Sequence, residues 1–460
     1  MARGKKKEAA LSPAERLQAT LVPESEQPYK VPENWCWVSL QTIDQYHSSS
    51  VDPSKYPSDL FELYSVPSSA NDYPEIVRGD EIGSTKQSVK KGDVLLCKIN
   101  PRINRVWKVS QYTENTLLAS SEWIIIRNSE INSDYLMYCF RAPYFREYML
   151  SNVSGVGGSL MRAQPKYVKT YPVPIPPFSE QQRIVDRIES LFAKLDEAKQ
   201  KAQDALDSFE TRKAAILHKA FNGELTALWR KEHGVGMESW KKSTVGQVCC
   251  DVKVGIVIKP SQYYTDKEKG TPAFRSANVR ENHIDNFDWV YLNHVGMENN
   301  SRSVVHTGDV LVVRSGNPGT ACVVSEKFDG YNAIDILIAV PDHKQISSEF
   351  LCNYTNSPFG KTLIFENKRG MALAHFNVKG YSELPISVPQ LDEQTEIVHI
   401  LDDLLAKERQ AKEAAEKVLE QIDLTKKAIL ARAFRGELGT NDPTEESAVE
   451  LLKKSFERGE

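Results

Sequence analysis

Two long stretches of the chain carry apolar or small residues at alternating steps of four and three. In the first stretch the pattern continues after Phe209 with one seven-residue step to Ile216 and Ala220. This spacing predicts two long amphipathic helices of the kind that pair in coiled coils. The seam positions are Ile184, Ile188, Leu191, Leu195, Ala198, Ala202, Ala205 and Phe209 in the first stretch, and Ile397, Leu401, Leu404, Ala411, Ala415, Val418, Ile422, Ile429 and Ala433 in the second, where Glu408 alone is polar.

The sequence also predicts where these helices begin and end. Prolines crowd residues 172–177, and proline lacks the N–H donor that a helix interior needs, so the first helix starts after them. We expect Ser179 and Asp392 as the N-caps of the two helices. Gly223 is a predicted stop, because glycine accepts the left-handed conformation that ends many helices. About 42 helical residues correspond to a rod of roughly 63 Å.

The two helical stretches are copies of one sequence element. Ser-Glu-Gln-Gln-Arg-Ile-Val at 179–185 is answered by Asp-Glu-Gln-Thr-Glu-Ile-Val at 392–398, 213 residues later, and the same offset relates 213–225 to 426–438. A repeated rigid element with different sequence between its copies favours a spacer that holds two unlike domains. Antiparallel pairing of the helices would place those domains at opposite ends, related by a pseudo-twofold axis. The alternative is that each helix packs only on its own domain.

The regions between the helices begin and end alike. Each starts near a tryptophan, contains Gly-Asp-Val-Leu (92–95 and 308–311) and closes on a proline-rich exit. Short buried strands alternate with helical pieces, which predicts an α+β fold. We divide the chain into an N-terminal extension (1–29), a first domain (30–178), a first spacer helix and linker (179–237), a second domain (238–391), a second spacer helix (392–438) and a C-terminal tail (439–460).

Composition narrows the class of protein. The net charge of −4 gives no sign of nucleic-acid binding, so any DNA-binding surface must come from local clusters of basic residues. No apolar run approaches the ~20 residues that span a bilayer. The seven cysteines are scattered without a C-x-x-C pair. We therefore expect a cytoplasmic protein without a disulfide framework or metal site.

Polar, basic loops follow the Gly-Asp-Val-Leu strands. Arginine can bond guanine and asparagine can bond adenine, so these loops are candidate base readers, while a lysine–arginine pair more readily contacts phosphate. Taken alone, the same loops also fit solvated turns with charge pairs. The candidates are Lys98, Asn100, Arg102, Asn104 and Arg105 in the first domain, and Arg275, Ser276, Asn278, Arg280, Arg314 and Asn317 in the second, with Lys368 and Arg369 as phosphate contacts.

The combined pattern resembles the specificity subunit of Type I restriction-modification systems, over nearly the whole chain from about Val31 to Leu438. The resemblance is carried by Pro-Ile-Pro-Pro-Phe-Ser-Glu-Gln (174–181), Ala-Phe-Asn-Gly-Glu-Leu-Thr-Ala-Leu-Trp-Arg (220–230), Pro-Gln-Leu-Asp-Glu-Gln (389–394) and Ala-Ile-Leu-Ala-Arg-Ala-Phe-Arg-Gly-Glu-Leu (428–438). The second copy departs from the first after Gly-Glu-Leu, where Gly439-Thr440 stands in place of Thr-Ala-Leu-Trp-Arg.

This resemblance implies a function and a set of partners. Each domain would be a target recognition domain that reads one half of a split double-stranded DNA sequence, and the antiparallel helix pair would fix the gap. Such a subunit is non-catalytic and holds no cofactor. It docks two methyltransferase subunits, which bind S-adenosylmethionine, and restriction subunits, which use ATP and Mg²⁺ to translocate and cut DNA.

Catalytic motifs that would indicate a standalone enzyme are incomplete. Asn317-Pro318-Gly319-Thr320 lacks the second proline and the aromatic residue of an adenine methyltransferase motif. Gly360-Lys361-Thr362 lacks the upstream glycine of a phosphate-binding loop. The remaining rival is a scaffold that does not bind DNA, with two ligand-binding domains on a coiled-coil spacer.

Overall fold

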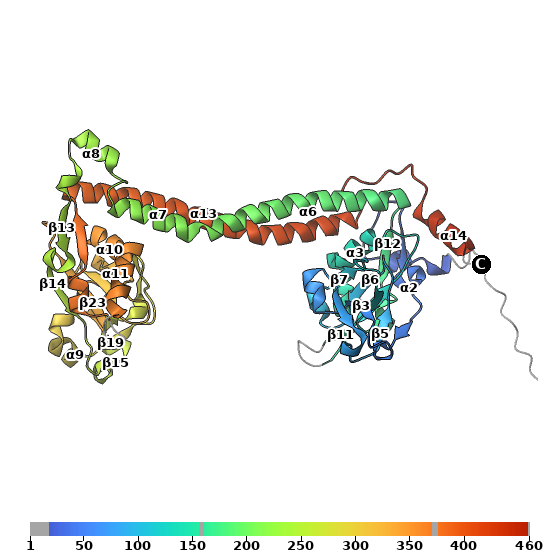
Figure 1. Ribbon diagram of the computed structural model, residues 1–460, viewed down its shortest axis with the longest axis horizontal. Helices are drawn as coiled ribbons and strands as arrows, with labels where there is room; N and C mark the ends of the chain where they lie inside the picture. Colours follow the sequence, from blue (N-terminus) through green and yellow to red (C-terminus); the bar gives the residue numbers. More distant parts are fainter. Residues whose placement is uncertain (1–17, 156–160, 370–375, 459–460) are drawn as a thin grey trace, which may run out of the picture. The chain divides into compact units, whose positions relative to one another are not determined.

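The computed structural model describes residues 18–155, 161–369 and 376–458. The chain divides into two compact units, which we call unit 1 (Met1–Lys201 with Val418–Glu460) and unit 2 (Ala202–Lys417). Each unit holds one domain of strands and helices together with a length of both long helices (Figure 1). The predicted α+β class is confirmed for both domains.

Unit 1 is built on two sheets and a small sheet that joins the start of the domain to its end. The larger sheet has the order β2-β5-β8-β3-β4, in which only β3 and β8 are parallel, and the second has the order β7-β6-β9. Strand β1 pairs antiparallel with β12, with Cys36 opposite Ile175. The elements are β1 Cys36–Ser39, α2 Leu40–Ile43, β2 Ser50–Val51, β3 Leu60–Tyr64, β4 Glu75–Arg78, β5 Lys86–Ser88, β6 Val94–Cys97, β7 Val106–Lys108, β8 Thr116–Ala119, β9 Trp123–Ile126, α3 Ser133–Arg141, α4 Pro143–Ser151, β10 Val153–Ser154, β11 Arg162–Ala163, α5 Pro165–Val168, β12 Pro172–Ile175 and α14 Ala448–Arg458.

Unit 2 repeats this plan with its own strand order. Its two four-stranded sheets have the orders β14-β23-β20-β21 and β15-β19-β16-β22, and β13 pairs with β24, with Lys241 opposite Val388. The elements are α8 Ala227–His233, β13 Lys241–Thr244, β14 Cys249–Val254, β15 Tyr264–Thr265, β16 Thr271–Phe274, β17 Val279–Arg280, β18 His283–Ile284, β19 Val290–Leu292, α9 His294–Asn299, β20 Val310–Val313, β21 Ala321–Val323, β22 Asn332–Ala333, β23 Ile336–Pro341, α10 Ser348–Asn356, α11 Pro358–Arg369, α12 Val378–Ser382 and β24 Pro385–Val388.

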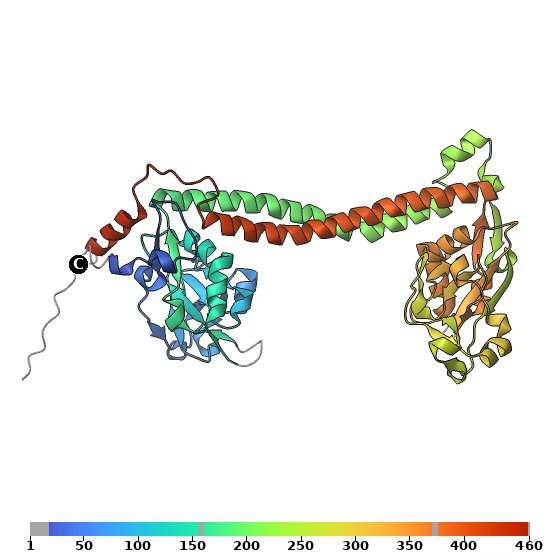
Figure 2. The same ribbon diagram turned by 180° about the vertical axis from the view of Figure 1, so that it is seen from behind.

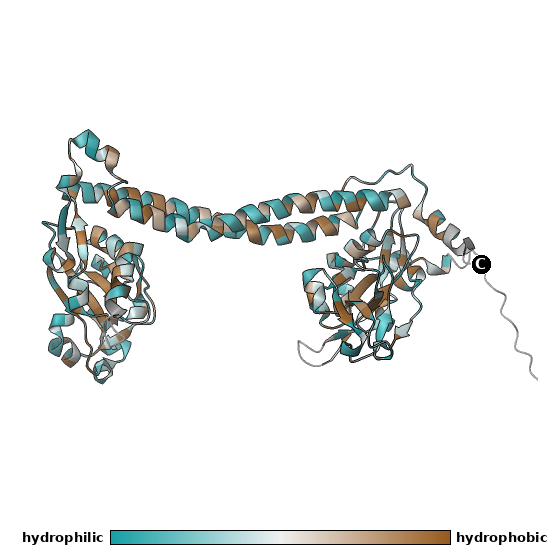
Figure 3. Ribbon diagram, viewed as in Figure 1, coloured by the Kyte–Doolittle hydropathy of each residue, from teal (hydrophilic) through white to brown (hydrophobic). Residues whose placement is uncertain are grey.

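The central strands of each domain are apolar on both faces, as Figure 3 shows by their brown colour. Every residue of β6 and of β20 is buried, so the predicted strands after Gly92-Asp93 and Gly308-Asp309 are confirmed. The helical part of this domain is divided into α3 and α4, because Pro143 cannot continue α3 beyond its C-cap, Ala142.

The long helices are α6 (Phe178–Asp207), α7 (Phe209–Phe221) and α13 (Leu391–Ala433). Helices α6 and α13 each begin one residue before the predicted cap, so Ser179 and Asp392 lie in the first turn and the expected N-caps were wrong. Gly223, with φ +85°, follows the C-cap of α7 as predicted.

The first spacer was expected to be one helix, but it is interrupted at Ser208. The Ser208 hydroxyl bonds the carbonyl of Asp204 at 2.7 Å, and the guanidinium of Arg212 donates to the carbonyl of Ala205 at 3.2 Å. When side chains donate hydrogen bonds to backbone carbonyls of a helix, they compete with the backbone N–H groups and interrupt or bend the helix locally.

Both long helices contact each other within each unit. In unit 1, Lys426 of α13 lies 2.5 Å from Asp196 of α6 and 5.1 Å from the ring of Phe192. In unit 2, Lys412 of α13 lies 4.9 Å from the ring centre of Phe209 of α7. Figure 2 shows the same helices side by side when the molecule is seen from behind.

The helix ends also belong to the domain cores. Ile184 and Ile188 of α6 share the core of unit 1 with Phe434, and Leu217 of α7 shares the core of unit 2 with Leu401 of α13. The long helices therefore contact each other and also pack on their own domains, whereas the sequence left these as two alternatives.

The C-terminal tail is packed on unit 1. Ala448 and Leu452 of α14 are buried in its core. Glu445 accepts two hydrogen bonds from Arg183, the shorter at 2.7 Å, and one from the Ser179 hydroxyl at 2.6 Å. Ser179, expected as a cap, therefore binds the tail.

Candidate nucleic-acid interface

The basic loop of unit 1 follows β6 and is held in a defined shape. Asn100 and Asn104 both adopt the left-handed conformation, with φ of 51° and 53°, on either side of the short 3-10 helix Pro101–Ile103. The backbone N–H of Asn100 donates to the carbonyl of Met161 at 2.7 Å, and Arg146 of α4 donates to the carbonyl of Arg102. The loop is therefore anchored from two neighbouring segments.

The candidate side chains of this loop differ in what they already bind. Arg102 is exposed, and its Nε donates to the side chain of Asn100 at 2.9 Å. The amide of Asn104 donates to the carbonyl of Arg141 at 3.3 Å. Lys98 and Arg105 are half-buried, and Arg105 lies beside the thiol of Cys97, whose pKa is raised by burial. Of this group, Arg102 presents the most accessible guanidinium.

The first candidate loop of unit 2 is a folded turn in which Asn278 is fully buried. Its side-chain oxygen accepts from the N–H of Arg275 at 2.9 Å, and its amide donates to the carbonyl of Phe287 at 2.7 Å. Arg275 pairs with Asp288 at 2.7 Å, and Arg280 pairs with Asp285 at 2.8 Å. Asn278 thus shapes the turn. Ser276 begins the short 3-10 helix Ser276–Asn278 within it.

The second candidate loop of unit 2 follows β20. Arg314 is bonded to Asp335 at 2.8 Å and to the carbonyl of Phe376 at 3.2 Å, and its side chain is only 16% exposed. Asn317, in contrast, is exposed. The side chains of Lys368 and Arg369 lie outside the described residues. Of these predicted residues, Arg314 is therefore already bonded within the protein, to Asp335 and to Phe376.

Most predicted seam positions of the long helices are buried. Leu191, Leu195, Ala198 and Leu404 are half-buried. Ala411 and Val418 are exposed, so their expected places between the helices have no support from burial. The buried positions are Ile184, Ile188, Ala202, Phe209, Ile397, Leu401, Ala415, Ile422 and Ala433.

Sequence reasoning missed the buried carboxylate at the start of each long helix. In unit 2, Glu393 accepts hydrogen bonds from Arg230 at 2.6 Å, from Thr226 at 2.7 Å and from the indole of Trp240 at 3.0 Å. We call these four residues junction 2. The pair of Arg230 and Glu393 is almost fully buried, with exposed side-chain fractions of 8% and 1%. Junction 2 ties the linker, the domain entry and α13 together.

Unit 1 has the corresponding junction 1, formed by Trp35, Glu180, Thr440 and Asn441. Glu180 accepts from the indole of Trp35 at 2.7 Å, from Asn441 at 2.9 Å and from Thr440 at 3.1 Å. Thr440 lies where the second copy of the repeat differs in sequence from the first. Its hydroxyl nevertheless donates to Glu180 as the hydroxyl of Thr226 donates to Glu393 in unit 2. Asn441 is neutral, whereas Arg230 is charged.

The glutamines that follow these carboxylates are duplicated in the same way. The side-chain oxygen of Gln181 accepts from the N–H of Asn132, and that of Gln394 accepts from the N–H of Ser347, both at 2.8 Å. Asn132 and Ser347 are the N-caps of α3 and α10. Each Glu-Gln pair fixes a long helix to its domain. The repeat of this pair in the sequence, at 180–181 and 393–394, was therefore a signal from which the two junctions could have been predicted.

The chain has two unlike α+β domains, and a matching junction fixes each of them to the long helices. This arrangement defines a class of protein with two different domains on a repeated helical element. Residues 60–206 and 237–421 match the family model described as "Type I restriction modification DNA specificity domain". The match covers more than half of the chain, which therefore belongs to this family. Its function is DNA sequence specificity in a Type I restriction-modification system.

Individual relatives agree with the family model. The chain is 26% identical over 341 residues to the Type I restriction enzyme EcoKI specificity subunit of Escherichia coli (strain K12), covering 70% of this chain and 71% of that protein. It is 24% identical over 308 residues to the EcoBI specificity subunit of Escherichia coli, covering 61% and 63%. The crystal structure of the HsdS subunit from Thermoanaerobacter tengcongensis shares the fold, with a TM-score of 0.65 and 21% identity over 90% of this chain and 100% of that chain.

The described part of the chain contains neither a membrane-spanning helix nor a cluster of metal-binding side chains. No helix there is long and apolar enough to cross a membrane. No group of three or more His, Cys, Asp or Glu residues there is arranged to hold a metal ion.

Proposed function

We propose that each unit reads one half of a split double-stranded DNA target and that the long helices, paired as an antiparallel coiled coil, set the gap between the halves. The matching junctions support this proposal, because each fixes a domain to the start of a long helix through hydrogen bonds to a buried carboxylate. A domain held at a fixed angle on a stiff helix makes half-site spacing a geometric property. The repeat of junctions, helices and entry sheets favours a pseudo-twofold relation between the copies.

The loops after β6 and β20 are the proposed reading surfaces. Arg102 in unit 1 and Asn317 in unit 2 are exposed on these loops. Lys98, Arg105, Arg275 and Arg280 would contribute after exchanging or sharing their present partners. Asn278 and Arg314 would act by holding their loops in shape, since their side chains are already bonded within the protein.

The proposed partners follow from this role. The chain is non-catalytic in this proposal and docks two methyltransferase subunits and the restriction subunits. S-adenosylmethionine, ATP and Mg²⁺ would be bound by those partners. A base must leave the duplex stack to be methylated, and that step would occur in the methyltransferase.

The decisive experiment is to express this chain with its methyltransferase subunit in a host that lacks other adenine methylation and to map methylated adenines across the genome. We expect one split motif with a constant gap. A contiguous motif, or methylation without any motif, would contradict the proposal. A scaffold that does not bind DNA, the rival function, predicts no motif that depends on this chain.

A further inference from the structure

The domain entry has the same two-stranded sheet in both units, which allows their outer edges to be compared residue by residue. Strand β1 pairs with β12 over four residues, and β13 pairs with β24 over four residues in the same antiparallel sense. In this register Trp37 and Lys242 occupy the same position, as do Val38 and Ser243.

In unit 1 the outer edge of β1 is covered by the chain's own N-terminal segment. Leu21 forms an antiparallel bridge with Val38, and the N–H of Val22 donates to the carbonyl of Trp37 at 2.9 Å. The segment therefore adds itself to the sheet edge as a further strand would.

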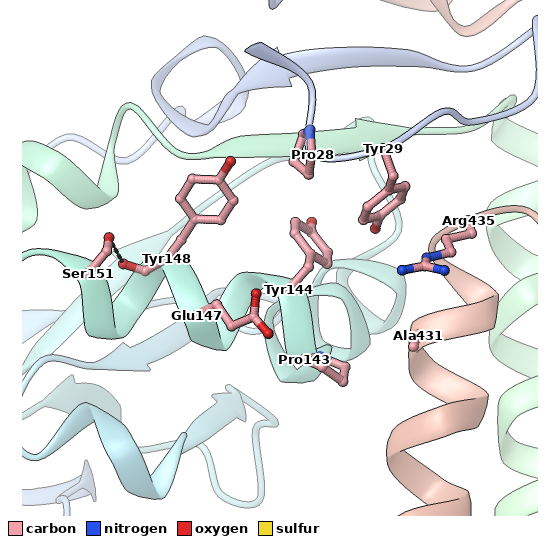
Figure 4. A pocket seen from close by; sticks show the side chains of 9 residues that line it. All are labelled: Pro28, Tyr29, Pro143, Tyr144, Glu147, Tyr148, Ser151, Ala431 and Arg435. Atoms are coloured by element: carbon pink, nitrogen blue, oxygen red, sulfur yellow. Dashed lines mark hydrogen bonds between the residues drawn. The ribbon is translucent and has the colours of Figure 1, made fainter. Parts of the chain in front are cut away.

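The same segment places an aromatic ring beside the domain. The ring of Tyr29 lies 5.1 Å from that of Trp37 and 5.5 Å from that of Tyr144, both edge-on. The guanidinium of Arg435 lies 5.0 Å from the Tyr29 ring centre. Figure 4 shows Tyr29 between Tyr144 and Arg435. An aliphatic pair thus lies at the strand edge of unit 1, and Tyr29 occupies part of a pocket of which about 470 Å³ remains open.

In unit 2 the corresponding surface is an open groove of about 430 Å³, lined among others by Phe221, Lys242, Ser243, Tyr354, Phe359 and Ile386. We call it the β13 groove. Phe359 follows the first proline of α11 as Tyr144 follows that of α4, and it is 53% exposed. Among the described residues, none outside β24 bonds the backbone of Lys242. The linker that precedes β13 forms helix α8, whereas the segment that precedes β1 runs along the strand edge (Figure 1).

We propose that the β13 groove binds an extended peptide segment of a partner protein. The segment places aliphatic residues along the edge of β13 and an aromatic ring against Phe359 and Tyr354. An acidic residue between them is favoured, because Lys241 and Lys242 are both exposed along this edge. The occupant comes from another protein because the chain's own segment of this kind is held on unit 1.

The chemistry of the occupant is read from unit 1, where the covering segment runs Leu-Val-Pro-Glu-Ser-Glu-Gln-Pro-Tyr from Leu21 to Tyr29. That the donor is a subunit of a restriction-modification assembly rests on the proposed function. Binding of the peptide does not rest on the proposed function and is measured without DNA. A negative result for peptide binding therefore leaves the proposed function untouched, and the reverse also holds.

The test uses the full chain and a fluorescent synthetic peptide of residues 20–30, with binding followed by anisotropy. We expect one saturable site. Phe359→Ala should weaken binding at least tenfold, because the aromatic ring of the peptide loses the surface on which it packs. Phe365→Ala is the matched control, because Phe365 is an exposed phenylalanine of the same helix and does not line the groove, and it should leave binding unchanged.

Two further variants sharpen the result. Phe359→Trp keeps an aromatic surface and should retain binding, and Lys242→Glu should weaken it most at low salt. The absence of a saturable site would overturn the proposal, as would equal binding by Phe359→Ala. Loss of binding in Tyr144→Ala with binding kept in Phe359→Ala would also overturn it, because the peptide would then be exchanging with the chain's own segment on unit 1.

Discussion

Arg212 of α7 and Glu408 of α13 form a two-point ion pair, with the Nε and Nη2 atoms of Arg212 each 2.9 Å from Oε2 of Glu408. Glu408 is the one polar residue in the second seam, and Arg212 lies inside the seven-residue step of the first. The two interruptions of the apolar pattern are therefore partners. A buried or half-buried polar pair in a helix interface favours one register over others.

Breaking this pair should destabilise unit 2 and loosen the helix register. Arg212→Ala removes the bonds to Glu408 and to the carbonyl of Ala205, so we expect it to cost about 1–2 kcal/mol, and Glu408→Ala to cost less. A double-mutant cycle by urea unfolding should give a coupling of about 0.5–1 kcal/mol. Lys407→Ala, which removes an exposed pair with Asp403, is the control. Additive single effects would contradict a direct partnership.

The two junctions should respond differently to the same substitution. Glu393→Gln leaves the buried Arg230 without its counter-charge and should cost about 3–5 kcal/mol. Glu180 is bonded by three neutral donors, so Glu180→Gln should cost about 1–3 kcal/mol. Calorimetric unfolding measures both, and the exposed Glu197→Gln is the control. A larger loss for Glu180→Gln would show that the charge of Arg230 does not decide the difference.

Arg102 and Asn278 should separate DNA recognition from loop stability. Arg102 is exposed, so Arg102→Gln should leave the unfolding temperature unchanged while it weakens DNA binding and lowers the salt slope by about one. Asn278→Ala should destabilise unit 2 by about 2–3 kcal/mol, because it leaves buried backbone groups without partners.

Methylation mapping of the Arg102→Gln variant tests the proposed division of the target. Only one half of the motif should relax. Equal relaxation of both halves would count against separate reading surfaces.

The sequence predicted those parts of the fold that depend on local pattern. Apolar spacing gave the long helices, and Gly223 gave the end of α7, because backbone conformation and one buried stripe decide both features. The interruption at Ser208 was not predictable from the seam, since it depends on side chains that bond nearby carbonyls.

The candidate site was less predictable because a polar residue looks the same in a sequence whether it binds DNA or the protein itself. Asn278 was expected to read bases, but Phe287 and Asp285 supply its partners from later in the chain. Glu180 and Glu393 lie in a polar repeat that does not predict burial, whereas tertiary contacts bury both. Such assignments depend on long-range partners that spacing does not encode.

Glu281 should make the stability of unit 2 depend on pH. Burial alone would raise its pKa, but Lys213 of α7 and Lys361 of α11 both pair with it and hold the pKa below its usual value. A depressed folded-state pKa stabilises the protein above the unfolded pKa, and this contribution is lost as the pH falls through the folded value.

The unfolding temperature of the wild type should therefore exceed that of Glu281→Gln at pH 7, and the difference should shrink as the pH falls below about 4.5. Exposed Glu268→Gln is the control. A difference that persists unchanged at pH 3 would mean that Glu281 acts through packing rather than through its charge.

If the long helices set the gap, then lengthening both should change it. Four residues added to α6 and four added opposite them in α13 lengthen the pair by about 6 Å, which corresponds to roughly two base pairs. The insertion turns each helix by about 40° beyond a full circle, and two base pairs turn DNA by about 70°, so the two rotations differ by about 30°. A stutter of four residues is tolerated in a coiled coil.

Mapping of methylated adenines should then give the same two half-sites separated by about two more base pairs. A variant with the same four-residue insertion in α6 alone is the control, because mismatched helix lengths disturb their pairing, and it should methylate poorly at any gap. An unchanged gap in the doubly lengthened protein would mean that the spacing is decided elsewhere, by the partner subunits or by the DNA.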